Sequence, residues 1–195
     1  MHGLINRSIQ SYVCNSYGTS AWAEAAQRAG LDFTDFEAML SYDDAITPRV
    51  LDAVSDLLDR PRADVMEDIG AYLVSHPSHE PLRRLLRFGG VNFCDFLHSL
   101  DDLPDRAKLA LPDLHLPRIE LRDHANGHFC LVCEAPVVGY GHVMMGILRV
   151  MADDYGALVL LDHTGIEAGV ETLSITLVEA EFSAGRHFDL GARAG

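Results

Sequence analysis

Apolar residues in the first half of the chain recur every three to four positions, which is the spacing of a helix that buries one face. Proline suits the first turn of a helix, so Pro48 and Pro61 each indicate a helix start. The pattern predicts helices from Leu4 to Val13, from Thr19 or Ser20 to Gly30, from Thr47 to Leu58, from Arg60 to Leu73 and from Val91 to Leu100, with a polar surface loop at residues 75–81.

The period changes after Pro117. Ile119 and Leu121 alternate with charged neighbours, as in a half-buried strand, and Asn126-Gly127 is a strong signal for the tight turn of a hairpin. The remaining elements are a hairpin arm at residues 129–133, a helix from Gly139 to Tyr155 and strands at Ala157–Asp162 and Thr172–Val178. The sequence therefore predicts an α+β fold, with a helical N-terminal part followed by a β-β-α-β-β antiparallel sheet.

The charge excludes some partners. Fifteen basic residues against 29 acidic ones leave a formal net charge of -14 at pH 7. Such a surface repels phosphate backbones and anionic lipids, so we expect no nucleic-acid and no membrane partner. No apolar run reaches the roughly 18 residues of a membrane span, and the first residues lack the layout of a signal peptide. We therefore expect a cytoplasmic protein, with its four cysteines reduced.

Several local sequences, in this order, resemble the H-NOX family of heme-nitric oxide/oxygen binding (HNOB) domains. The residues that carry the resemblance are Met1-x-Gly3-Leu4-Ile5, Tyr42-Asp43-Asp44, Phe96-Leu97-x-Ser99-Leu100-Asp101-Asp102, Leu116-Pro117-Arg118 and Gly146-Ile147-Leu148. The resemblance covers residues 1–182 as a single domain. It implies a helical subdomain at 1–88, a subdomain of helix plus antiparallel sheet at 89–182, and a C-terminal tail at 183–195.

The resemblance implies a sensor. Family members hold heme between their two parts, with one histidine as axial iron ligand and a Tyr-x-Ser-x-Arg motif on the heme propionates. They report to a signalling partner such as a histidine kinase, a cyclic-di-GMP enzyme, a chemotaxis receptor or a guanylate cyclase. The heme pocket positions that the resemblance implies are Ile5, Ile9, Leu100, Pro104, Pro117, Leu131 and Cys133.

Both heme anchors of the family are replaced in this chain. Pro104 stands fourteen residues before Arg118, in the position of the axial histidine, and proline offers no side-chain lone pair to iron. In the propionate motif, Leu131 replaces tyrosine, Cys133 replaces serine and Ala135 replaces arginine. The loss of that arginine removes a bidentate contact to a carboxylate.

Two histidines are candidates for a substitute heme ligand. His98 lies six residues before Pro104. On a continuous helix of 3.6 residues per turn, its side chain would point about 120° away from the direction of the family's axial histidine. His142 approaches from the C-terminal side, next to the inward Val143. Three other histidines are expected on the surface: His115, His124 and His128. If heme binds, Val143 stands near the position where relatives supply a hydrogen bond to oxygen and offers none, so the resemblance implies a preference for nitric oxide over oxygen.

Other motifs point to no further chemistry. Cys130 and Cys133 lie three apart on a strand and so face opposite sides, and zinc would need two more ligands. Three pairs of adjacent aspartates are expected to cap helices or face solvent: Asp43-Asp44, Asp101-Asp102 and Asp153-Asp154. No nucleophile motif or phosphate-binding loop is present, so we expect no enzyme activity.

The sequence favours an H-NOX-like sensory domain that is heme-free and regulates a separate signalling partner. In this interpretation larger side chains fill the pocket, with Leu131 and Met144 or Met145 as candidates. The first alternative is a heme-binding nitric oxide sensor with a non-standard ligand. The others are a thiol sensor at Cys133 and a site for another apolar ligand.

Overall fold

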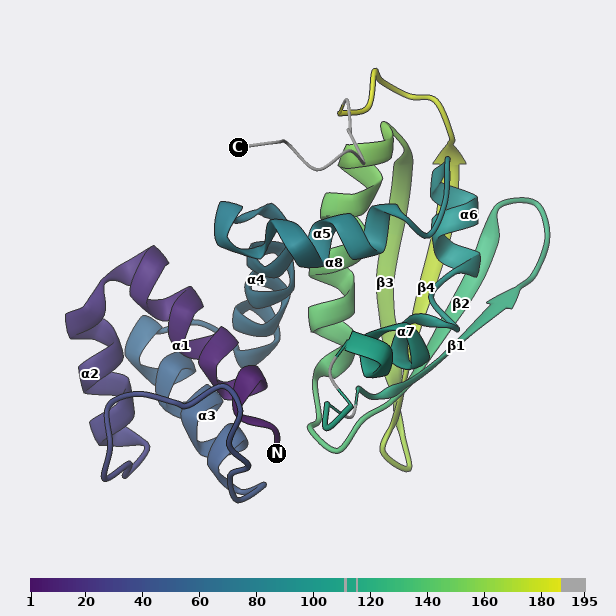
Figure 1. The fold of residues 1–195 in the computed structure, drawn as a ribbon. Helices are drawn as coiled ribbons and strands as arrows, with labels where there is room; N and C mark the ends of the chain where they lie inside the picture. Colours follow the sequence, from purple (N-terminus) through teal and green to yellow (C-terminus); the bar gives the residue numbers. More distant parts are fainter. Residues whose placement is uncertain (111, 115, 187–195) are drawn as a thin grey trace.

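The computed structural model of the chain describes residues 1–110, 112–114 and 116–186. Its elements confirm the predicted order of helices followed by β-β-α-β-β (Figure 1). The helices and the short 3-10 helix η1 are α1 (Gly3–Tyr17), α2 (Thr19–Arg28), α3 (Ile46–Leu58), α4 (Arg62–Ser75), η1 (Pro77–His79), α5 (Glu80–Arg87), α6 (Phe93–His98), α7 (Leu103–Ala110) and α8 (Tyr140–Tyr155). The strands are β1 (Arg118–Asp123), β2 (His128–Glu134), β3 (Leu158–Glu167) and β4 (Val170–Glu179).

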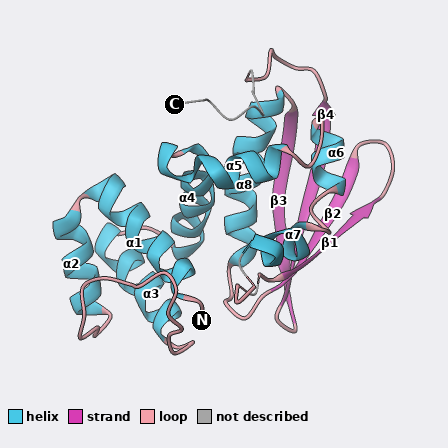
Figure 2. Cartoon of the chain, viewed as in Figure 1, coloured by secondary structure: helices cyan, strands magenta, loops and turns pink. Residues whose placement is uncertain are grey.

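Helices α1 to α4 form the helical half, which Figure 2 shows as cyan helices joined by pink loops, without strands. Their apolar faces meet in one buried cluster that includes Ile9, Val13, Trp22 and Val54. The start of α1 is capped by His2, whose Nδ1 accepts a hydrogen bond from the Leu4 amide at 3.2 Å. The helical half thus has a core of its own, as the amphipathic spacing predicts.

The other half is built on a four-stranded antiparallel sheet with the order β1-β2-β4-β3 (Figures 1 and 2). Alternate residues of each strand face one side, where α5 to α8 pack and make a second core cluster. In that cluster Leu131 of β2 is paired with Leu173 of β4 and Leu121 of β1. The period-2 pattern seen in the sequence therefore marks the covered face of the sheet.

Helices α4 and α8 join the two halves by direct backbone contact. A Cβ on Gly70 of α4 would overlap the carbonyl oxygen of Val143, and one on Gly146 of α8 would overlap that of Glu67. Glycine at both positions allows the helix axes to approach closely. Val143 packs against both core clusters, so the side of α8 near its start belongs to both halves.

The structure differs from the predicted elements around residues 75–103. The expected surface loop at 75–81 contains η1 and the start of α5. The expected helix from Val91 to Leu100 is shortened to α6, because Asn92 caps it and its regular turns end at His98. The 88/89 subdomain boundary stays a prediction, although Val74 and Leu86, which precede it, already pack in the sheet-side cluster.

Candidate functional site

Pro104 is the second residue of α7, in the first turn of that helix. A proline is tolerated there, because its missing N–H would have no partner within the helix in any case. Its neighbours Leu103 and Ala107 are 5% and 8% exposed and face the core, whereas Pro104 itself is half-buried. The side chain at this place is a saturated ring that can fill space but cannot donate electrons to a metal.

The strand positions that the resemblance assigned to the propionate motif lie inside the sheet-side core. Leu131 and Cys133 are both 0% exposed and belong to the cluster that contains Leu100 and Met144. Burial, reinforced by Glu171 and Cys130, raises the pKa of the Cys133 thiol to about 12. At neutral pH Cys133 is therefore protonated and covered, and this disfavours thiolate chemistry.

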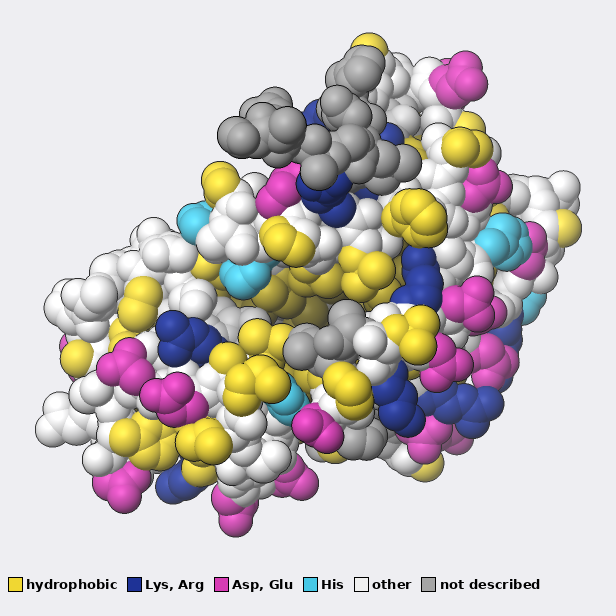
Figure 3. Space-filling model, viewed as in Figure 1, with side chains coloured by type: hydrophobic (Ala, Val, Ile, Leu, Met, Phe, Trp, Pro, Cys, Tyr) yellow, Lys and Arg dark blue, Asp and Glu magenta, His cyan; other side chains and the backbone are white. Residues whose placement is uncertain are grey.

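The predicted pocket wall draws on both halves. Ile9 packs in the helical cluster and Leu100 in the sheet-side cluster, while Pro117 is buried just before β1 and Ile5 is half-buried on α1. Figure 3, viewed as Figure 1, shows a hollow lined by apolar side chains over α8, between α5 and α7. An apolar hollow therefore lies between the two halves. Met144 and Met145, the expected filling residues, are buried in the sheet-side cluster with Leu131.

The two candidate ligand histidines make other contacts. His98 is 54% exposed in its side chain, with Nε2 3.5 Å from the Asp123 carboxylate and its ring edge-on to Phe129. The ring of His142 is stacked on His163 of β3, with centroids 4.4 Å apart and planes 7° apart. Of the other histidines, His124 and His128 are exposed as expected, and His115 lies outside the described residues.

Glu171 of β4 completes a polar cluster at the start of α8. It is 2% exposed, and its carboxylate accepts hydrogen bonds from the Gly139 amide (2.7 Å), the Gly141 amide (3.0 Å) and His163 Nε2 (2.9 Å). The sequence analysis missed His163 and Glu171. The available signal was that Glu171 shares the period-2 register of the core residues Leu173 and Ile175, which places a carboxylate on the covered face.

The expectation for Asp154 was wrong. We predicted a cap or a solvent-facing carboxylate, but Asp154 is 1% exposed and forms a bidentate ion pair with Arg83 of α5, at 2.7 and 2.9 Å. This hydrogen-bonded carboxylate raises the pKa of Arg83 further. The sequence could not show the pair, because its partners are 71 positions apart.

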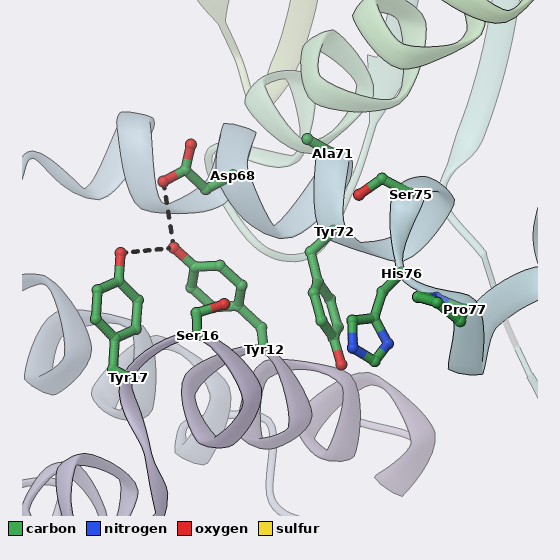
Figure 4. Close-up of a pocket in the computed structure, with 9 residues that line it drawn as sticks. All are labelled: Tyr12, Ser16, Tyr17, Asp68, Ala71, Tyr72, Ser75, His76 and Pro77. Carbon is green, nitrogen blue, oxygen red and sulfur yellow. Dashed lines mark hydrogen bonds between the residues drawn. The ribbon is translucent and has the colours of Figure 1, made fainter.

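Figure 4 shows a pocket of about 400 Å³ between the ends of α1 and α4. The Tyr12 hydroxyl lies 3.3 Å from the Tyr17 hydroxyl and donates to Asp68 at 3.2 Å. Burial first, and then these two neighbours, raise the pKa of Tyr12. Asp68 also pairs with Arg60, so these polar groups are already bound to protein atoms. None of the site residues predicted from the sequence lines this pocket.

The described residues contain neither a metal-ligand cluster nor a membrane-spanning helix. Nowhere in residues 1–110, 112–114 and 116–186 do three histidine, cysteine or acidic side chains come together in a way that could hold a metal ion. Within the same ranges no helix is both long and apolar enough to cross a membrane.

Comparisons with known proteins give a consistent result. A family model described as Haem-NO-binding (HNOB) matches residues 2–163. The chain is 24% identical over 149 residues to the soluble guanylate cyclase gcy-31 of Caenorhabditis elegans, covering 76% of this chain and 21% of that protein. It is 22% identical over 158 residues to the soluble guanylate cyclase 89Da of Drosophila melanogaster, covering 81% of this chain and 24% of that protein. The chain thus spans less than a quarter of either cyclase.

The fold matches solved structures over nearly all of their length. An H-NOX protein from S. oneidensis in the Fe(II)NO ligation state superposes with a TM-score of 0.75 at 19% identity, covering 91% of this chain and 99% of that one. The I5F mutant of the T. tengcongensis H-NOX gives a TM-score of 0.74 at 14% identity, covering 92% and 99%. At these identities the superpositions show a shared fold.

Proposed function

The chain belongs to the haem-NO-binding family, and from this premise we propose that it is an H-NOX-type sensory domain that regulates a separate signalling protein without a histidine-ligated heme. The family is defined by a sensory rather than a catalytic domain. Since less than a quarter of each matched guanylate cyclase aligns with this chain, their cyclase activity is not carried over. The proposal therefore concerns sensing and partner contact.

The observation that carries the proposal is the chemistry at the two heme anchors. The side chain of Pro104 has no atom that can ligate iron, and Leu131, Cys133 and Ala135 offer no cation or hydroxyl to a propionate. Leu131 and Cys133 are moreover fully buried among apolar residues. The residues present do not fit a heme that is ligated by histidine and held by its propionates.

The substitute ligands do not restore the fit. The His98 ring is largely exposed beside Asp123, and the His142 ring is stacked on His163, so both are engaged outside the apolar hollow. We infer that neither binds iron. A thiol sensor at Cys133 is also disfavoured, because the thiol is 0% exposed and its pKa is raised to about 12.

One observation favours the alternative of a heme-binding nitric oxide sensor with a non-standard ligand. The hollow between the halves is lined by apolar side chains (Figure 3), as a porphyrin ring would require. Val143 at the start of α8 provides no hydrogen-bond donor, which would favour nitric oxide over oxygen. This alternative requires an iron ligand that the geometry of His98 and His142 does not offer.

The partner class follows from the family. The family resemblance supports a histidine kinase, a cyclic-di-GMP enzyme or a chemotaxis receptor as the partner. Because two relatives are soluble guanylate cyclases, a guanylate cyclase is a further candidate partner. The net charge of -14 favours a partner whose contact surface is basic.

Absorption spectra test the proposal. The purified chain is measured as isolated, after hemin addition, and after reduction with and without nitric oxide. We expect no band beyond that of loosely bound hemin. A sharp Soret band that shifts with nitric oxide would overturn the heme-free proposal and support the alternative.

A matched gain-of-function variant shows whether the fold itself still accepts heme. It combines Pro104→His with Leu131→Tyr, Cys133→Ser and Ala135→Arg, which restores both anchors. Heme uptake by this variant, together with none by the unmodified chain, would place the difference at these four residues. Equal uptake by both chains would contradict the role given to the anchors.

A further inference from the structure

Two imidazole rings lie face to face at the start of α8. His142 of α8 and His163 of β3 have ring centroids 4.4 Å apart and planes inclined by 7°. His163 is 14% exposed in its side chain, and its Nε2 lies 2.9 Å from Glu171 Oε2. Because a carboxylate only accepts hydrogen bonds, Nε2 of His163 carries the proton. One imidazole ring of this stack is therefore directly hydrogen-bonded to a buried carboxylate.

The same carboxylate holds the first turn of α8. Glu171 accepts the amides of Gly139 and Gly141, which are among the unpaired donors at the start of the helix. The space is closely filled: a Cβ on Gly141 would lie 2.7 Å from Glu171 Oε2 and 3.0 Å from the His163 ring. The His163 ring, the carboxylate and the helix start therefore cannot move independently.

Opposing effects act on the protonation of His142. Burial first, and then His163, lower the pKa of His142, and they outweigh the attraction of Glu171 on β4 and of Glu67 and Asp64 on α4. Two further titratable groups near Glu171 and the start of α8 are protonated at neutral pH: Cys133 on β2 and Tyr140 on α8, both with pKa values raised by burial. The Arg62 guanidinium of α4 donates to the Val138 carbonyl just before that start. On acidification the pair becomes two cations at stacking distance, which is repulsive.

The first turn of α8 also lies at the joint between the two halves. Val143 follows His142 directly, packs against both core clusters and has its carbonyl oxygen against Gly70 of α4. A displacement of this turn therefore reaches α4 and the side of α8 that faces the helical half.

We propose that His142, His163 and Glu171 form a proton-sensitive switch at the start of α8. While at most one of the two rings is positively charged, Glu171 holds the Gly139 and Gly141 amides and the helix start is closed. When both rings are positively charged they separate, the hydrogen bonds of Glu171 to the helix start weaken, and Val143 shifts between the halves. The switch does not depend on whether the hollow binds heme.

Hydrogen exchange of the full chain tests the proposal. Protection factors, corrected for the intrinsic pH dependence of exchange, are compared at about pH 7.5 and about pH 5 on either side of the histidine range. In the unmodified chain we expect protection of the amides from Gly139 to Val143 to fall roughly tenfold, the factor that corresponds to one pKa unit. Protection in the β1–β2 ladder should stay unchanged, which separates a local opening from global unfolding.

Two variants provide the comparison. In His142→Gln the stack cannot take a second charge, so the pH-dependent loss of protection should vanish. His124→Gln removes an exposed histidine and should behave like the unmodified chain. Unchanged protection in the unmodified chain at the lower pH, or the same loss in His142→Gln, would overturn the proposal.

A magnetic resonance titration of the ring of His142 tests the coupling independently. Since His163 lowers the pKa of His142, His163→Gln should raise it. An unaltered pKa of His142 would show that a charge on His163 does not affect the protonation of His142, and the switch would be excluded.

Discussion

The two halves of the molecule satisfy their buried polar groups differently. In the helical half the least exposed polar side chains are neutral: the Thr47 hydroxyl donates to the Asn6 side chain at 2.7 Å, and both residues are at most 1% exposed. In the sheet-side half they are carboxylates, with Asp154 1% and Glu171 2% exposed. Each carboxylate binds donors from another element, Arg83 in the first case and Gly139, Gly141 and His163 in the second.

The difference shows where charge has a structural role. Asp154 lies near the end of α8, and Glu171 holds its start, so both ends of this central helix are fixed by buried carboxylates. Neutral hydrogen bonds respond little to pH, whereas ion pairs and imidazole–carboxylate contacts respond strongly. We expect the sheet-side half to be the pH-sensitive one.

The largest effect is expected for Asp154→Ala. It removes the bidentate partner of the Arg83 guanidinium, which is 15% exposed, and breaking a buried ion pair costs about 3 kcal/mol. The free energy of unfolding is measured in urea. Asp153→Ala, at the exposed neighbour, is the control and should change stability by less than about 0.5 kcal/mol. Equal effects of the two substitutions would show that the pair contributes nothing specific.

A moderate effect is expected for Thr47→Val in the helical half. The substitution keeps the shape but leaves the Asn6 carbonyl without its 2.7 Å donor, at a cost of about 1–2 kcal/mol. Adding Asn6→Leu should recover part of this loss, because no polar atom is then left unpaired. A double variant whose loss is the sum of the single losses would contradict the pairing.

A smaller effect is expected from pH. The pKa of His142 is lowered in the folded protein from its ordinary value of 6.5, so the unfolded chain takes up the proton first. The contribution of His142 is therefore fully present above pH 6.5 and is lost as the pH falls toward the folded pKa. Urea midpoints measured across this range should fall with acidification, and His142→Gln should flatten the slope. An equal slope in both chains would refute the assignment.

The smallest effect is expected for Glu24→Gln on α2. Glu24 pairs with Arg28 at 2.5 Å, but both side chains are about half exposed, and such pairs contribute at most about 0.5 kcal/mol. The unfolding midpoint should hardly move. A loss comparable with that of Thr47→Val would mean that surface charge contributes more to the helical half than its neutral core contacts indicate.

The fold was largely predictable because each element has a local signature. The apolar faces of α1, α3 and α8, the Asn126-Gly127 turn and the alternation in β2 and β4 all depend on neighbours in sequence. Two helix starts were missed although each has a local signal: Asn92 caps α6, and Pro81 lies in the first turn of α5.

The site was predictable in its identities but not in its contacts. Pro104 and the β2 residues were assigned to the site by resemblance, and the structure has Pro104 in the first turn of α7. The His142–His163 stack and the Arg83–Asp154 pair join residues that are distant in sequence, so no local pattern could show them. Only the register of Glu171 with Leu173 and Ile175 carried a sign of a buried charge.

The glycine contact between α4 and α8 limits how this domain can be recombined with others. Because Gly70 and Gly146 bring backbone against backbone, no side chain at that contact can adjust to a helix from a different parent. A chimera that exchanges the helical half must therefore take α4 and α8 together, although α8 follows β2 in the sequence. Exchangeable modules in this molecule are defined by that contact and not by the order of the chain.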